Sequence, residues 1–174
     1  DERMSQMEKE NENLLNETLK AAGQLSEVRR NTAPKVEQEM ESRLENLGMT
    51  HIRFQVAVNP LPIPAEEGMD EVVFLFSSNK NVPLQNIADI ASGGEMARVM
   101  LSLKAMLTSK QQFSTIIFDE IDTGVSGRIA EKMALMMREM SRGGRQVVSI
   151  THLPQIAALG EYHYKVYKED NEQT

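Results

Sequence analysis

The stretch "TIIFDEIDTGVSGRIA", residues 115–130, decides the fold prediction, because it places an apolar strand, two acids and a helix start in direct succession. The apolar run before Asp119 and Glu120 is typical of a strand buried in a parallel sheet, where helices cover the faces. A helix is expected from about Gly127 to Met140, with a methionine-rich apolar face that we interpret as core. The stretch therefore predicts one strand–helix unit of an α/β fold.

The segments on either side repeat this alternation of helix and strand. A regular helical pattern runs from Gly93 to about Thr108, ahead of the apolar strand. A second apolar strand, "QVVSI" at residues 146–150, leads into a short helix opened by Pro154. Buried strands that alternate with amphipathic helices predict a mainly parallel sheet with helical cover.

A small antiparallel strand pair is predicted ahead of the parallel region. Residues 51–59, "HIRFQVAVN", alternate apolar with polar or small side chains, and residues 71–77, "EVVFLFS", form a second apolar strand. Residues 60–70, "PLPIPAEEGMD", are expected to form a loop, because proline cannot donate to a strand ladder.

The N-terminal 30 residues carry a 3-4 spacing of mainly apolar positions, which is the pattern of a coiled-coil seam. The seam positions are Met4, Met7, Asn11, Leu14, Thr18, Ala21, Leu25 and Val28. We favour a coiled coil, because the seam is narrow and its flanks are polar. The alternative is an amphipathic helix that lies on the core of the same domain.

A second helix is expected after this seam, with Pro34 in its first turn and Gly48 as its C-terminal cap. This boundary divides the chain into a coiled-coil arm segment, residues 1–30, and a lobe that comprises residues 31–174. Because no second heptad segment is present to pair with the arm, its partner is expected to be another chain or another part of the same protein.

The composition limits the class of protein. The chain has 174 residues, 40% of them hydrophobic, no cysteine and a net charge of −7. These values fit one sizeable domain and exclude both disulfides and cysteine-based zinc sites. No apolar stretch approaches the roughly 20 residues that a membrane span needs, so a cytoplasmic protein with no membrane partner is expected. No basic excess announces nucleic-acid binding.

A helix start with two glycines, "ASGGE" at residues 91–95, is the first candidate site. Ser92 and Glu95 have the spacing of a capping box, in which each side chain accepts a hydrogen bond from the other residue's backbone N–H. A cap does not explain Gly93 and Gly94, which each cost a helix roughly 1 kcal/mol relative to alanine. Bare amides at a helix N-terminus favour an anion, so we interpret this helix start as a phosphate site.

Polar residues beyond the two apolar strands form the second candidate site. Asp119 could hold Mg²⁺, usually through water, and Glu120 could orient or deprotonate an attacking water. His152 follows the second strand in "VVSITHLPQ". Taken singly, these residues also fit an acidic turn and an ordinary loop histidine. Their shared place at the carboxyl ends of parallel strands favours a ligand site.

Together these motifs resemble the signature, Walker B and switch-histidine elements of ABC-type ATPase heads of the SMC class. The sequence is most similar to the RecN family, the bacterial SMC-like DNA repair ATPases. The similarity lies in the segments "IASGGEMARVMLSLKAML", "IIFDEIDTGVSGRIA" and "THLPQIAALGEYHYKV". The resemblance implies the C-terminal lobe of an ABC/SMC-type P-loop ATPase head with an N-terminal coiled-coil helix. It also implies ATP binding and hydrolysis in DNA double-strand break repair and recombination, in the nucleoid-associated part of the cytoplasm.

The resemblance assigns roles to the candidate residues. It implies that the signature residues, Ser92, Gly93, Gly94 and Glu95, bind the γ-phosphate side of an ATP held by a facing protomer. Asp119 would serve Mg²⁺, Glu120 would be the catalytic base, and His152 would sense or stabilise the γ-phosphate. Ser126 stands where most ABC proteins have the D-loop aspartate, so its role is left open.

A Walker A motif is absent from the sequence, because none of the 10 glycines is followed directly by lysine. ATP hydrolysis is therefore expected only when this chain combines with a Walker-A-bearing N-terminal half of the same protein and with a second head. The implied partners are that half, a second copy bound through sandwiched ATP, and DNA. Two rival interpretations are a non-catalytic coiled-coil interaction or regulatory module and a fragment of an ABC transporter ATPase.

Overall fold

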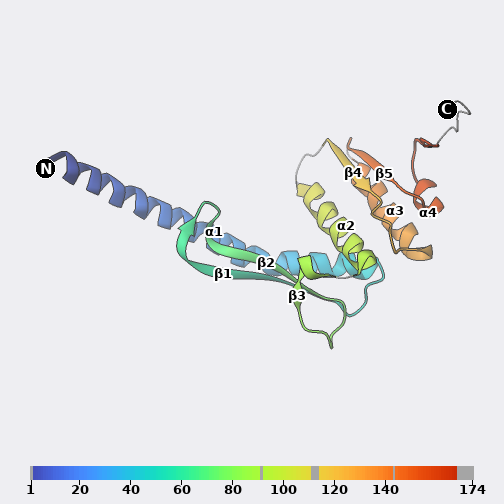
Figure 1. Cartoon of the computed structure of the whole chain (residues 1–174), viewed down its shortest axis with the longest axis horizontal. Helices are drawn as coiled ribbons and strands as arrows, with labels where there is room; N and C mark the ends of the chain where they lie inside the picture. The colour runs from blue at the N-terminus through green and yellow to red at the C-terminus, as the bar shows by residue number, and fades with distance from the viewer. Residues whose placement is uncertain (1, 91, 111–113, 143, 168–174) are drawn as a thin grey trace, which may run out of the picture. The chain divides into compact units, whose positions relative to one another are not determined.

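The computed structural model describes residues 2–90, 92–110, 114–142 and 144–167. The chain divides into two compact units, Asp1–Ser92 and Gly93–Thr174, which are described one at a time (Figure 1). The first unit contains one long helix and an antiparallel sheet, and the second contains a parallel strand pair with helices. The α/β class and both kinds of strand pairing predicted from the sequence are confirmed.

Helix α1 runs without a break from Glu2 to Asn46, so the prediction of a second helix that begins at Pro34 is wrong. Proline removes one helical hydrogen bond, a cost that tertiary packing can offset. Ala33 and Met40, which lie on either side of Pro34, are buried in this unit, and the helix contacts both long strands. The helix ends at Asn46, and Gly48 follows two residues later with a φ of 80° in the left-handed region, as predicted for a C-terminal cap.

The first unit's sheet has the strand order β1-β2-β3. Strand β1, Arg53–Ala65, pairs antiparallel with β2, Gly68–Ser77. The two-residue strand β3, Gln85–Asn86, also pairs with β2. It leads into the short 3-10 helix η1, Ile87–Asp89. Phe54 and Phe76 face each other across the ladder and are buried. This pairing confirms the predicted antiparallel pair and forms the core under α1.

The expectation of a loop over residues 60–70 is wrong, because β1 continues through its prolines to Ala65. Strand β1 is at the sheet edge, so alternate N–H groups point away from β2. The N–H groups of Phe54 and Val56 donate to the carboxylates of Glu41 and Glu37 of α1, at 3.0 and 2.8 Å. Pro60 is an even number of positions from Phe54 and Val56, so its nitrogen also points away from β2 and its missing N–H breaks no ladder bond. The register shifts after Pro60.

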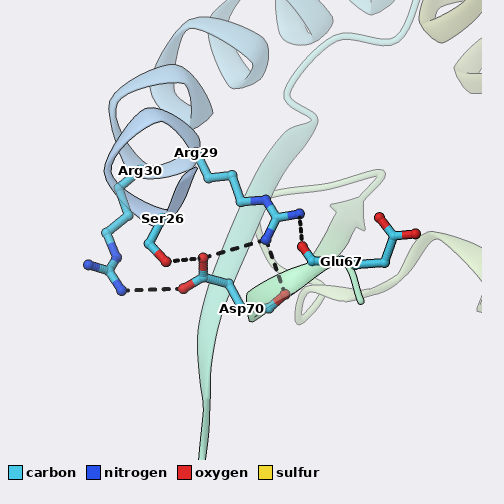
Figure 2. Close-up of polar contacts among 5 residues, drawn as sticks. All are labelled: Ser26, Arg29, Arg30, Glu67 and Asp70. Carbon is cyan, nitrogen blue, oxygen red and sulfur yellow. Dashed lines mark hydrogen bonds and ion pairs between the residues drawn. The ribbon is translucent and has the colours of Figure 1, made fainter. Parts of the chain in front are cut away.

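A polar cluster joins the tip of the β1–β2 hairpin to α1 (Figure 2). The buried Asp70 carboxylate accepts a hydrogen bond from the Ser26 hydroxyl and forms ion pairs with Arg29 at 3.6 Å and Arg30 at 3.4 Å. Arg29 also donates to the Glu67 carbonyl at 2.7 Å. Since a buried carboxylate needs partners for its charge, this cluster, hereafter the hairpin latch, holds the tip at one position along the helix.

The N-terminal half of α1 leaves its predicted seam uncovered. The large apolar seam residues are exposed: Met4, Met7, Leu14, Leu25 and Val28. A different face of the helix is buried in the first unit, at Ala22, Ser26, Ala33, Met40 and Leu44. The seam therefore does not lie on the core of the same chain. A coiled-coil partner for residues 1–30 stays a prediction, and so does the boundary that separates this arm from the lobe at residues 31–174. No helix in the described ranges is long and apolar enough to cross a membrane.

The second unit has a two-stranded parallel sheet, β4, Thr115–Asp119, and β5, Gln146–Ile150. Helix α2, Gly93–Lys110, precedes β4, helix α3, Gly127–Ser141, joins the two strands, and α4, Pro154–Ala157, follows β5. The methionine-rich face of α3 is core, as predicted. The strands differ from the prediction of full burial: Ile116 and Phe118 are buried, but Ile117 is 61% exposed, because no described segment covers that face.

Candidate ATPase site at the end of the parallel strands

The acid pair lies at the carboxyl end of the parallel sheet. Asp119 is the last residue of β4 and pairs with Ile150, the last residue of β5. The Glu120 N–H donates to the Ile150 carbonyl at 3.1 Å, which extends the pairing by one residue. His152 follows β5 by two positions. The structure thus brings the two acids and the histidine to one edge of the sheet, where ligands gather in such folds.

Glu120 has an unusual backbone conformation, with a φ of 46° in the left-handed region. Its carbonyl accepts hydrogen bonds from the N–H of Thr123 at 3.2 Å and from the Thr123 hydroxyl at 2.9 Å. A non-glycine residue in this region costs of order 1–3 kcal/mol, and such residues cluster at functional sites. The turn therefore fixes the position of an exposed carboxylate at the sheet edge.

Asp122 is the site residue that the sequence analysis missed. Its side chain is 0% exposed, and it lies in the turn that follows Glu120. Carboxylate Oδ2 accepts a hydrogen bond from the Thr151 hydroxyl, and Oδ1 lies 3.7 Å from Nδ1 of His152. The Thr151 hydroxyl in turn accepts the Leu153 N–H at 3.0 Å. The only sequence signal was a third acid in "DEID", which resembles an ordinary solvated turn residue.

The two signature glycines at the start of helix α2 have different surroundings. Ser92 immediately precedes the helix, as a capping residue must. Gly94 is buried, and a Cβ added there would lie 2.8 Å from the carbonyl oxygen of Gly124, in the turn after β4. At Gly93 an added Cβ would meet no atom within 4 Å. Packing thus explains Gly94 directly, while the open surface at Gly93 fits the predicted approach of a ligand.

Arg98 lies one turn into the same helix and binds the carbonyl of Gly94. Its Nε donates to the Gly94 carbonyl at 2.9 Å. Burial lowers the pKa of Arg98, and the nearby Glu95 carboxylate opposes that shift. The guanidinium nevertheless keeps its charge, because the intrinsic pKa of arginine is far above neutrality.

Ser126, in the D-loop position, immediately precedes α3 and makes no side-chain capping bond, which leaves its role open.

Asp119 is the remaining candidate, as the ligand of a metal ion. In the described ranges, no group of three or more His, Asp or Glu side chains is close enough to hold a metal ion. Mg²⁺ usually takes one or two carboxylates with waters and phosphate oxygens, so the single exposed carboxylate of Asp119 fits such a donor set.

Comparison with solved structures identifies the fold. The chain resembles the Smc head domain of Pyrococcus furiosus with an extended coiled coil, which was solved bound to the C-terminal domain of ScpA. The TM-score is 0.63 and the identity 17%, over 91% of this chain and 38% of the Smc chain. A chain from a study of ATP-driven dimerization and DNA-stimulated activation of SMC ATPases matches with a TM-score of 0.57 and 17% identity, over 83% of this chain and 84% of that one. The fold is that of an SMC ATPase head lobe.

Sequence comparison then gives the particular family. DNA repair protein RecN of Bacillus subtilis is 37% identical over 97% of this chain and 32% of its own length. The RecN protein of Synechocystis is 39% identical over 87% of this chain and 26% of its own length. No protein-family profile matches the sequence. The chain belongs to the RecN family, and it spans about a third of the length of the curated relatives it matches.

Proposed function

We propose that this chain is the C-terminal lobe of an SMC-like ATPase head that acts with DNA in double-strand break repair and recombination, in the nucleoid-associated part of the cytoplasm. The observation that supports the proposal is the common sheet edge of Asp119, Glu120 and His152, where β4 and β5 end in register. In this proposal the lobe supplies the hydrolytic groups, and a Walker-A-bearing half supplies the phosphate-binding loop.

Each side chain has a role that its position supports. Bound Mg²⁺, held through Asp119, would neutralise charge on the phosphate oxygens of ATP. Glu120 orients and deprotonates the attacking water from a backbone position that the turn to Thr123 fixes. His152 senses the γ-phosphate by accepting a hydrogen bond from the attacking water that lies against it. Ser92 and Gly93 bind the ATP of a facing head, with Gly94 and Glu95 completing the motif.

The exposed face of the parallel strands supports the proposed partner. Ile117 and Ile150 are 61% and 52% exposed, and Val148 lies beside them on the same face. Apolar side chains on a parallel sheet are normally covered, because helices pack on both faces. The N-terminal half of the same protein is the proposed cover, and two completed heads would then pair through ATP. The name of one structural relative likewise describes ATP-driven dimerization of SMC ATPases.

The decisive experiment replaces Glu120 by glutamine in the full-length protein. We expect nucleotide binding and ATP-dependent head pairing to persist and turnover to fall by a factor of about 100 or more, since the base is lost while the geometry is kept. Glu131→Gln, an exposed change on α3, is the matched control and should leave turnover unchanged. Unchanged hydrolysis in Glu120→Gln would remove the assignment.

A second experiment separates the ATPase from a non-catalytic interaction module. This chain is mixed with its Walker-A-bearing half, and ATP hydrolysis is measured. Hydrolysis that requires both pieces supports the composite site. Stable association of the pieces without any hydrolysis supports the interaction module, which the exposed seam of α1 also fits.

A further inference from the structure

Asp122 is a buried charged side chain that the proposed roles leave unused. One of its carboxylate oxygens, Oδ2, is bound by the Thr151 hydroxyl. The other, Oδ1, is buried and has no hydrogen-bond partner in the described part of the chain. A buried carboxylate oxygen without a donor is costly, and such atoms in native structures call for a specific explanation.

His152 offers the missing donor. Its Nδ1 lies 3.7 Å from Oδ1 of Asp122, just beyond hydrogen-bond length, and its side chain is 66% exposed. Because most of the ring is not packed, a modest rotation brings Nδ1–H into hydrogen-bond range. The Thr151 hydroxyl cannot take this role, because it donates to Oδ2 and accepts the Leu153 N–H at 3.0 Å.

We propose that Asp122 is the positioning residue for His152. Its carboxylate accepts Nδ1–H, which holds the neutral ring in the Nδ1–H tautomer and leaves the Nε2 lone pair to accept a hydrogen bond from the attacking water beside the γ-phosphate. The hydrogen bond made by one imidazole nitrogen determines the protonation of the other, so this contact selects the state that His152 presents to a ligand. The benefit to ATP hydrolysis rests on the proposed function, whereas the tautomer is a property of this chain alone.

The same carboxylate also joins the two loops of the site. Asp122 belongs to the turn that fixes Glu120, and its partners Thr151 and His152 follow β5. A purely structural role for Asp122 would require only the Thr151 bond and would leave the tautomer of His152 unaffected. A positioning role also uses Oδ1, which lies next to Nδ1, and fixes that tautomer.

The first test reads the tautomer by nitrogen-15 NMR of the histidine rings in this chain without nucleotide, at a pH where the rings are neutral, with His152→Gln for assignment. An unconstrained imidazole favours Nε2–H, so we expect mainly Nδ1–H in the wild type and reversion to Nε2–H in Asp122→Ala. Asp119→Asn, which removes a neighbouring carboxylate, should leave the tautomer unchanged. A wild-type His152 that is mainly Nε2–H overturns the proposal without any variant.

The second test is a double-mutant cycle in the full-length protein. We expect Asp122→Ala to lower kcat for ATP hydrolysis by a factor of about 10 or more, with little change in KM, and to cause no further loss in a His152→Ala background. Equal losses in both backgrounds overturn the proposal, because they indicate that Asp122 acts independently of His152. If Glu120→Gln shows that the site does not hydrolyse ATP, the NMR result still decides the Asp122–His152 contact.

Discussion

Replacing Gly94 by alanine tests how closely helix α2 approaches the turn after β4. The new methyl carbon would lie 2.8 Å from the Gly124 carbonyl oxygen, which belongs to backbone and cannot rotate away. Overpacking costs about 1–3 kcal/mol, and contact with fixed backbone puts this change in the upper part of that range, at about 2–3 kcal/mol. Alanine gains at most about 1 kcal/mol in helix propensity. We therefore expect a net loss of about 1–2 kcal/mol in the free energy of unfolding.

Gly93→Ala is the matched control, because it makes the same chemical change one residue earlier, where no atom lies within 4 Å of the new methyl. It should be neutral or slightly stabilising. Thermal unfolding of both variants, followed by circular dichroism, should show a Tm lower by about 2–8 °C for Gly94→Ala only. Equal stability of the two variants would refute the contact between α2 and the turn, and the second signature glycine would again lack a packing explanation.

Three further changes test separate contacts. Asp70→Ala should lower the free energy of unfolding by about 2 kcal/mol or more, because the Ser26 hydroxyl loses its buried acceptor and Arg29 and Arg30 lose their ion pairs. Urea unfolding should show no such loss for the exposed neighbour variant Glu71→Ala. Glu41→Ala removes the acceptor for the Phe54 N–H at an edge strand, so light scattering should detect greater self-association, and a monomeric variant would contradict this. Ser92→Arg in the full-length protein should abolish ATP-dependent head pairing in sedimentation while ATP binding persists; intact pairing would remove the signature assignment.

The second unit could be predicted from local sequence, because its strands and helices have strong and separate periodicities. The strand before Asp119, the helix from Gly127 and the strand from Gln146 all lie within a residue or two of their predicted bounds. Such elements are bounded by their own turn residues, including Gly124 and Gly127, whose φ values are positive.

The first unit was harder to predict, because its prolines are accommodated by contacts with distant residues. Pro34 does not end α1, since buried residues on both sides keep the helix against the hairpin. Pro60 does not end β1, since the strand is an edge whose outward donors are already directed to α1. Neither the edge position nor the helix contact has a local sequence signal.

The candidate site was predicted in its outline but not in its supporting contacts. The spacing of Asp119, Glu120 and His152 along the chain was sufficient to place them at one sheet edge. Asp122 was not recognised, because its burial depends on Thr151, which is distant in sequence. The packing reason for Gly94 was missed in the same way, since Gly124 lies on a different element.

The continuity of α1 has a mechanical consequence. A helix of 45 residues is roughly 68 Å long at 1.5 Å per residue. Its C-terminal half is bound to the sheet by the hairpin latch and by the glutamates that accept hydrogen bonds from β1. The helix therefore runs without a break from its exposed N-terminal turns to its contacts with the sheet. A sideways force on the first turns is therefore transmitted as torque to β1 and β2 at the hairpin latch, which the force reaches before it reaches Pro34.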